Sequence, residues 1–117
     1  MASTTTGTIL AVPIRKLAND NKVAPYRHDD DELTLWINEA VRKVTAIRSD
    51  ALYATDGTLL TVTPITDITG TVTIDDKWQD LIVDYAVSRC LEKVGGQTFN
   101  ATKAKYHLDR FITMIKV

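Results

Sequence analysis

The sequence predicts a mainly α-helical protein, a helical bundle of three to four helices with a small inserted β-hairpin. Apolar residues recur at helical spacing up to about residue 47 and again after about residue 76. Between residues 51 and 75 they alternate with polar residues instead. The 117 residues, 44% of them hydrophobic, are enough for one compact core. We therefore expect a disordered N-terminal tail over residues 1–7 and a single domain over residues 8–117.

The first helix is expected over residues 8–19, where Leu10, Ile14 and Leu17 fall on one face. Pro13 leaves two alternatives, because proline has no backbone N–H to donate inside a helix. Either the helix begins near Pro13, with the proline in its first turn, or the proline kinks it.

The second helix, expected over residues 30–47, has the clearest start signal in the chain. Asp29 stands three residues before Glu32, which is an aspartate version of the capping box. Acidic residues in the first turn also interact favourably with the positive end of the helix dipole. Its apolar stripe consists of Leu33, Trp36, Ile37, Ala40, Val44 and Ile47.

Residues 51–75 predict a β-hairpin or a pair of short strands. Asp56-Gly57 is a strong turn signal, and residues 71–74 alternate cleanly. Pro64 cannot donate a hydrogen bond to a ladder, so it is confined to an edge or a break. Because a hairpin alone is only marginally stable in water, this one needs packing from elsewhere.

Two more helices are expected, from about residue 76 to 94 and from about residue 100 to 116. Asp75 or Asp76 caps the first of them, and Gly95-Gly96 ends it. Its apolar residues cover more than one face, so it must be surrounded, either by its own domain or by neighbouring subunits.

The last helix carries its apolar residues on one side, and the three long helices are expected to share one core. The apolar side of the last helix consists of Ala101, Ala104, Leu108, Phe111, Ile112 and Ile115. We expect Trp36, Leu81, Tyr85 and Phe111 to meet in the common core.

The composition argues against several classes of function. A net charge of −1 gives no global electrostatic case for binding nucleic acid or an anionic membrane. No apolar run approaches the roughly 20 residues that span a bilayer, and the start lacks the features of a signal peptide. The single cysteine, Cys90, fits a reducing compartment. We therefore expect a protein made in the cytoplasm.

No constellation of catalytic or metal-binding residues is apparent. Neither histidine, His28 nor His107, has a partner at metal-ligand spacing, and we expect His107 to be half-buried packing. The acidic run at residues 29–32 lacks the spacing and turn glycine of a calcium loop, and helix capping explains it. No nucleophile motif or nucleotide fingerprint appears. We expect no enzyme activity, catalytic residue, cofactor or metal.

Two stretches of the chain resemble the head–tail adaptor proteins of tailed bacteriophages, also called connector or head-completion proteins. The first, from Tyr26 to Ala40, joins an aromatic–arginine pair, a capped acidic start and a Trp-Ile-Asn sequence. The second, from Leu81 to Cys90, carries Asp-Tyr and then an arginine followed by a small residue. In order, the resemblance covers about residues 8–116.

The resemblance implies a structural protein of the virion that is located at the head–tail junction. During assembly such a protein is present in the host cytoplasm. Such proteins form a ring, commonly of twelve copies, beneath the portal protein. The ring extends the DNA channel, lets packaged DNA pass without specific binding, and offers the attachment surface for tail or nozzle proteins. No membrane is involved. The apolar residues of the 51–75 segment, namely Tyr53, Leu59, Leu60 and Val62, are candidate contacts with other subunits or the next ring.

Two other classes of function remain open from the residues alone. A small nucleic-acid-binding regulatory protein would use the basic residues along the helices, such as Arg42, Lys43 and Arg48. A small enzyme or accessory domain would need a site hidden from sequence inspection, with perturbed titrating groups in a deep polar pocket.

Overall fold

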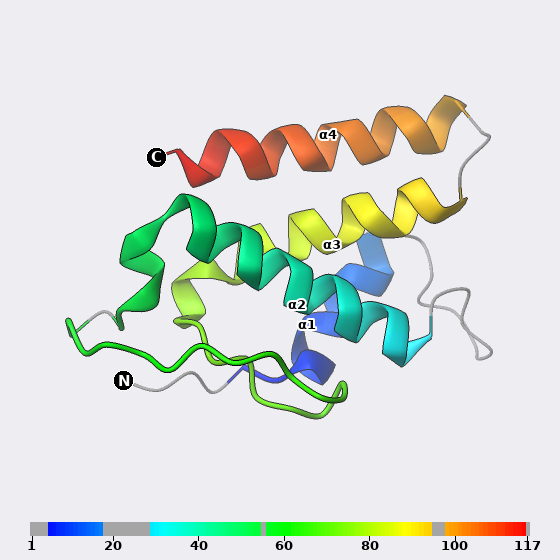
Figure 1. Cartoon of the computed structure of the whole chain (residues 1–117). Coiled ribbons are helices and arrows are strands. Elements are labelled where there is room, and N and C mark those ends of the chain that lie inside the picture. Colours follow the sequence, from blue (N-terminus) through cyan, green and yellow to red (C-terminus); the bar gives the residue numbers. More distant parts are fainter. Residues whose placement is uncertain (1–4, 18–28, 55, 95–97, 117) are drawn as a thin grey trace.

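The computed structural model describes residues 5–17, 29–54, 56–94 and 98–116 (Figure 1). The described residues confirm the mainly helical fold. In chain order the elements are α1 (Gly7–Leu17), α2 (Asp30–Ile47), the 3₁₀ helix η1 (Ser49–Leu52), the 3₁₀ helix η2 (Asp76–Trp78), α3 (Gln79–Val94) and α4 (Thr98–Ile115). The expected glycine stop at Gly95-Gly96, His28 and the first four residues of the expected tail lie outside the described residues.

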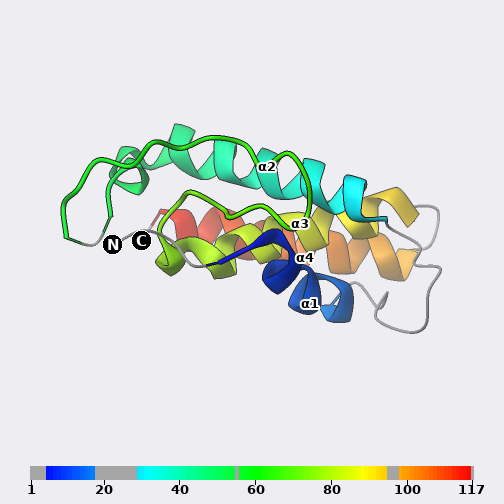
Figure 2. The same cartoon turned by 90° about the horizontal axis from the view of Figure 1, so that it is seen from below.

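Helix α3 lies at the centre of the molecule (Figures 1 and 2). Helices α1, α2 and α4 all pack against it, and α4 makes few contacts with any other described helix. Every residue from Leu81 to Ser88 is buried. The domain itself therefore surrounds α3, so the apolar surplus of this helix is no longer an argument for neighbouring subunits.

The core contains the four residues that the sequence predicted to meet in it. Trp36, Leu81, Tyr85 and Phe111 are all buried and belong to one hydrophobic cluster. The ring centroids of Tyr85 and Phe111 lie 5.3 Å apart and the ring planes make an angle of 60°, a tilted arrangement that aromatic pairs favour. The three long helices thus share one core, as expected.

The start of α2 is fixed by the capping box. The backbone N–H of Glu32 donates to the Asp29 carboxylate at 2.8 Å, and the backbone N–H of Asp29 donates to the Glu32 carboxylate at 3.4 Å. Two backbone donors at the helix start, which have no partner within the helix, are thereby satisfied.

Replacing Asp29 with alanine is therefore expected to lower the free energy of unfolding by about 0.5–2 kcal/mol. Urea denaturation monitored by circular dichroism measures the change. The matched control is Asp31→Ala, which removes a charge from the same first turn without touching the cap. Equal stability of the Asp29 variant and the wild type would contradict the capping role.

Residues 5–7 do not form the disordered tail that the sequence predicted, because they bind a distant segment. The N–H of Gly7 donates to the Gly70 carbonyl at 3.0 Å, and the N–H of Val72 donates to the Thr5 carbonyl at 2.8 Å. A Cβ atom at residue 7 would lie 2.5 Å from the carbonyl oxygen of Ile68, so this close approach requires glycine.

Helix α1 begins at Gly7, well before the proline in it. Pro13 lies in the interior of the helix, so the alternative in which the helix starts near Pro13 is wrong. The side-chain oxygen of Thr6 accepts a hydrogen bond from the N–H of Ile9 at 3.3 Å, which is the bond of an N-cap. This start is hard to predict because Thr6 stands among several similar threonines.

Within the described ranges, residues 51–75 form no pair of strands, contrary to the expected hairpin. The β-pairing among the described residues consists of two isolated antiparallel bridges, Tyr53 with Leu59 and Thr6 with Thr71. The physical reason is that the second half of the segment turns into the core, where Ile65, Val72 and Ile74 are buried. We call residues 53–75 the loop.

The side chain of Asn38 takes the place of a partner strand for the loop. Its amide nitrogen donates to the Ile65 carbonyl at 2.9 Å, and its oxygen accepts from the Ile65 N–H at 2.9 Å. These two bonds satisfy the backbone of a buried residue that no strand reaches.

Asn38→Ala is accordingly expected to destabilise the protein by about 1–3 kcal/mol, because both polar groups of the Ile65 backbone lose their partner. The comparison variant is Thr45→Ala, since Thr45 lies on the same helix and bonds only to carbonyls of its own helix. Thermal melts of the two variants side by side give the difference. A smaller loss for Asn38→Ala than for Thr45→Ala would show that the loop does not depend on this contact.

Candidate functional site

A buried polar cluster joins α3 to α4. Asp84 and His107 are each only 3% exposed. The His107 Nδ1 atom lies 3.0 Å from the Asp84 Oδ1 atom, and the Arg110 Nε atom lies 3.6 Å from Asp84 Oδ2. His107 is therefore fully buried rather than half-buried, and it has an acidic partner that sequence spacing did not reveal. The sequence does contain one indication of the pair, namely a carboxylate, Asp84, in an otherwise apolar stretch. A buried carboxylate needs a partner, so one had to be expected.

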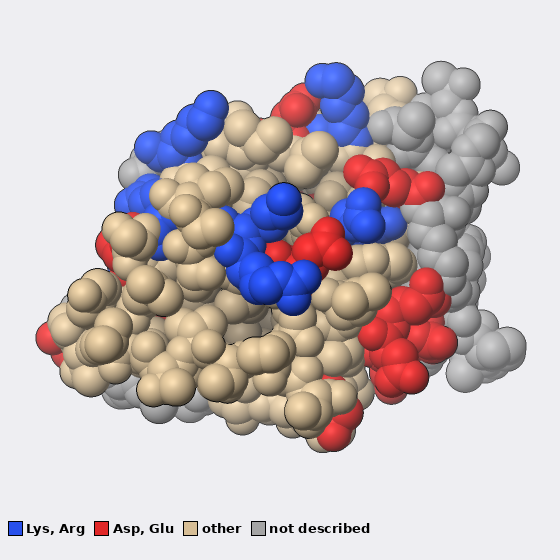
Figure 3. All heavy atoms as spheres, viewed as in Figure 1, with Lys and Arg blue, Asp and Glu red and all other residues tan. Residues whose placement is uncertain are grey.

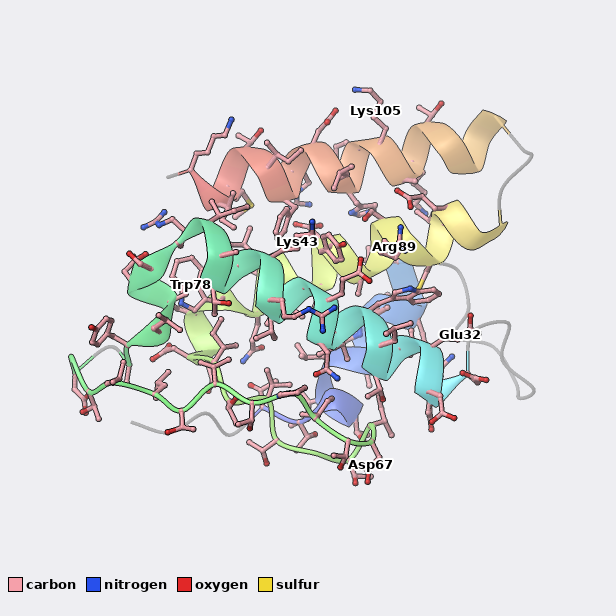
Figure 4. All side chains as sticks on the ribbon, in the orientation of Figure 1. Glu32, Lys43, Asp67, Trp78, Arg89 and Lys105 are labelled. Carbon is pink, nitrogen blue, oxygen red and sulfur yellow. The ribbon has the colours of Figure 1, made fainter. Side chains whose placement is uncertain are left out.

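A second polar cluster joins α2 to α3. Tyr85 donates its hydroxyl to the Glu39 carboxylate, and the Arg89 Nε atom lies 3.4 Å from a Glu39 oxygen. Arg89 also pairs with Glu92 at 2.9 Å, and Figure 4 shows its side chain on α3. Burial, and then the bond to Glu39, raise the pKa of Tyr85 to about 12. The Tyr85 hydroxyl donates this bond only while it is protonated. Its contribution to the free energy of unfolding is therefore fully present below pH 10 and is lost as the pH rises towards 12.

One of these two clusters contains an acid–histidine pair, Asp84 with His107. An acid–histidine pair acts in covalent catalysis when a hydroxyl or thiol lies within hydrogen-bond reach of the histidine. The buried serine of α3, Ser88, donates its hydroxyl to the Tyr85 carbonyl. Among the residues whose positions are described, no three His, Cys, Asp or Glu side chains gather closely enough to hold a metal ion.

A shallow groove runs between α1 and α3. It has a volume of about 610 Å³, and its walls are mostly apolar, with exposed Ile9 and Val12 contributed by α1. Asp84 and Arg110 border it, and Asp84 Oδ2 accepts no hydrogen bond from the residues that the structure describes. The polar residues in its lining are Gln79, Asp80, Asp84 and Arg110.

Large apolar side chains are exposed on further parts of the molecule, among them Leu35 and Ile47 on α2. Two of these parts are the loop and α4. Of the four candidate contacts, Tyr53 and Leu59 are exposed, whereas Leu60 and Val62 are partly buried. On α4 the exposed apolar residues are Tyr106, Ile112 and Met114. The sequence placed Ile112 on the core side of its helix, and this is wrong: the side chain lies at the margin of the buried face and is 41% exposed.

Charge is distributed unevenly between these two parts. Residues 49–76 contain five aspartates and no lysine or arginine, whereas residues 103–116 contain four basic residues and one aspartate. On the face seen in Figure 3, most lysine and arginine side chains lie over the upper half, and acidic side chains border the lower half and one end of α2. The loop is therefore acidic and α4 is basic.

Comparisons with protein families, with curated proteins and with solved structures give no match to this chain. None of the helices in the described part of the chain is long and apolar enough to cross a membrane.

The described residues that carry the resemblance to phage adaptors have structural roles in this fold. Trp36 belongs to the core, Asn38 holds the loop, and Glu39 binds Tyr85. In the second stretch Asp84 binds His107, and Arg89 pairs with Glu39. The two stretches thus interlock three helices and the loop, which explains why these residue types occur together.

Proposed function

We propose that this chain is a structural, ring-forming subunit, a head–tail adaptor of a tailed bacteriophage. The observation that carries the proposal is the number of large apolar side chains that stay exposed on a flat domain of 43 × 29 × 16 Å, among them Val12 on α1, Leu35 on α2 and Leu59 on the loop. Large apolar residues that remain exposed in a folded subunit are typical of interaction sites. The resemblance of residues 26–40 and 81–90 specifies which assembly this is.

In this proposal the ring docks beneath the portal protein, extends the DNA channel and provides the attachment surface for tail or nozzle proteins. DNA passes through the lumen without specific binding, so the lumen wall is neutral to acidic. Ion pairing supports this, because several basic side chains are already neutralised within the subunit. These pairs are Arg48 with Asp50, Arg89 with Glu92 and Lys105 with Asp109.

The outer half of the loop contacts neighbouring subunits through Tyr53 and Leu59, with Leu60 and Val62 behind them. The bridge between Tyr53 and Leu59 extends into the small β-hairpin when a neighbouring copy packs on it, because packing supplies the stability that an isolated hairpin lacks. Because Ile65 belongs to the core, a deletion within the loop would damage the fold as well as this contact. A single substitution at Leu59 leaves the core intact.

The decisive experiment is to incubate the purified protein with the portal protein encoded in the same genome and to image the mixture by negative-stain electron microscopy. A stoichiometric ring added to the portal is the expected result. A portal that gains no density in the presence of excess subunit would remove the adaptor proposal.

A second candidate function, a nucleic-acid-binding regulatory protein, is favoured by the basic residues of α4. Fluorescence anisotropy with duplex DNA at several salt concentrations separates the two functions. The adaptor proposal expects no measurable binding at physiological salt. Tight binding whose affinity falls steeply with salt would instead support the regulatory protein, because that slope counts the phosphates neutralised.

A further inference from the structure

One side of α1 is apolar although it faces solvent. Ile9, Val12 and Leu17 are 54%, 68% and 38% exposed. At 3.6 residues per turn, these three side chains, Pro13 and Lys16 fall within about 140° of the helix surface. We call these five residues the outer face of α1. Figure 2 shows α1 at the lower edge of the molecule, below α3.

The other described long helices do not gather their exposed apolar side chains in this way. On α2, Leu35 and Ile47 are separated by about three turns of helix. On α4, Ile112 and Met114 lie about 200° apart around the axis, on opposite flanks of the buried face. The outer face of α1 is therefore the most continuous of these apolar surfaces.

The outer face is continuous with the groove between α1 and α3. All of its residues except Lys16 also line the groove, and Asp80 lies on the opposite wall, on α3. Lys16 and Asp80 are both exposed, and neither forms an ion pair with another described residue. The surface thus combines apolar side chains with one unpaired charge of each sign.

The direction of α1 determines where these two charges lie. Thr5, which stands just before α1, donates its hydroxyl to Asp76 at 2.8 Å and accepts a hydrogen bond from the Gln79 side chain at 2.6 Å. Near the other end of α1, Arg15 pairs with Asp30 of α2 at 2.9 Å. The beginning of α1 therefore lies beside the beginning of α3, close to Asp80, and Lys16 lies at the far end.

We propose that two copies of the chain form a symmetric dimer in which the outer faces of their α1 helices pack against each other in antiparallel orientation. The antiparallel arrangement brings the far end of each α1 to the beginning of the other. Lys16 of each copy then meets Asp80 of the other copy, while Val12 and Pro13 lie near the two-fold axis. A parallel arrangement would place the two Lys16 side chains together and leave both Asp80 side chains unpaired, so complementary charge selects the antiparallel one.

This contact is the same on both copies, so it closes at the dimer and does not propagate. It removes the apolar outer face from water in the free subunit. The inference does not rest on the proposed function, because it concerns the chain in solution without a portal.

Sedimentation equilibrium of the full-length protein over a wide range of concentration tests the dimer. A reversible monomer–dimer equilibrium is expected for the wild type. Val12→Glu should raise the dimer dissociation constant by more than about ten-fold, because it buries two carboxylates close together near the axis. Leu35→Glu is the matched control, since it adds the same charge at a similarly exposed apolar residue on α2 and should leave the constant unchanged. Circular dichroism verifies that both variants fold.

An exchange of charges tests the orientation. Lys16→Glu and Asp80→Lys should each weaken the dimer several-fold, because each places like charges opposite one another. The double variant Lys16→Glu/Asp80→Lys should restore the wild-type dissociation constant, which loss of fold or of net charge alone would not do.

Three results would overturn the proposal. These are a wild-type protein that stays monomeric or assembles beyond the dimer, a dimer that is indifferent to Val12→Glu, and a double charge exchange that fails to restore binding. None of these measurements includes the portal protein, so their outcome is separate from the test of the adaptor function.

Discussion

Trp36→Ala is expected to lower the free energy of unfolding by about 3–5 kcal/mol, because it removes a large buried side chain and leaves a cavity. Trp36 is 6% exposed and belongs to the cluster that joins α2 to α3. A loss of this size is a large part of the stability of a typical domain, so the variant should be partly unfolded at body temperature.

The matched control for Trp36→Ala is its neighbour, Leu35→Ala, on the exposed side of the same helix. Because Leu35 is already solvated, its replacement should change the free energy of unfolding by no more than about 0.5 kcal/mol. Chemical denaturation followed by circular dichroism compares both with the wild type. Equal effects of the two substitutions would show that the core is not built around Trp36.

His107→Ala is expected to have an effect of similar size, about 3–5 kcal/mol, for a different reason. The substitution leaves the buried carboxylate of Asp84 with only Arg110 nearby, at 3.6 Å. His107→Gln keeps a side-chain N–H that can donate to the carboxylate, so we expect its loss of stability to be smaller.

The double variant Asp84→Ala/His107→Ala tests whether the two residues act as a pair. Its loss of stability should be smaller than the sum of the two single losses, because removing both partners leaves no uncompensated buried carboxylate. Additive losses in denaturation experiments would mean that the pair is a geometric coincidence. Thr113→Ala, at an exposed position of the same helix, controls for damage to α4 itself.

The parts of the fold that the sequence predicted are those determined by local patterns. The start of α2 was predictable because Asp29 and Glu32 satisfy each other within one turn. The core position of Trp36 followed from helical spacing alone. In both cases the information lies within a few residues of the feature it determines.

The parts that the sequence did not predict depend on partners far apart in the chain. Asp84 and His107 are separated by 23 positions and lie on different helices. The loop alternates like a strand, yet Asn38, 27 positions away, holds it against α2. The alternation of residues 71–74 reflects burial of Val72 and Ile74 on one side and does not require a partner strand. Periodicity reports which side of a segment is buried but not what covers it.

The attachment of α1 determines when this helix can join the fold during synthesis. It leaves the ribosome first, yet the carbonyl of Ile68 that binds the hydroxyl of Thr8 lies 60 residues further along the chain. Closing so long a stretch of chain costs entropy, which contacts between neighbouring elements such as α3 and α4 do not incur to the same extent. The first helix to be made is therefore one of the last to dock, and a nascent chain that ends before residue 68 exposes its apolar face.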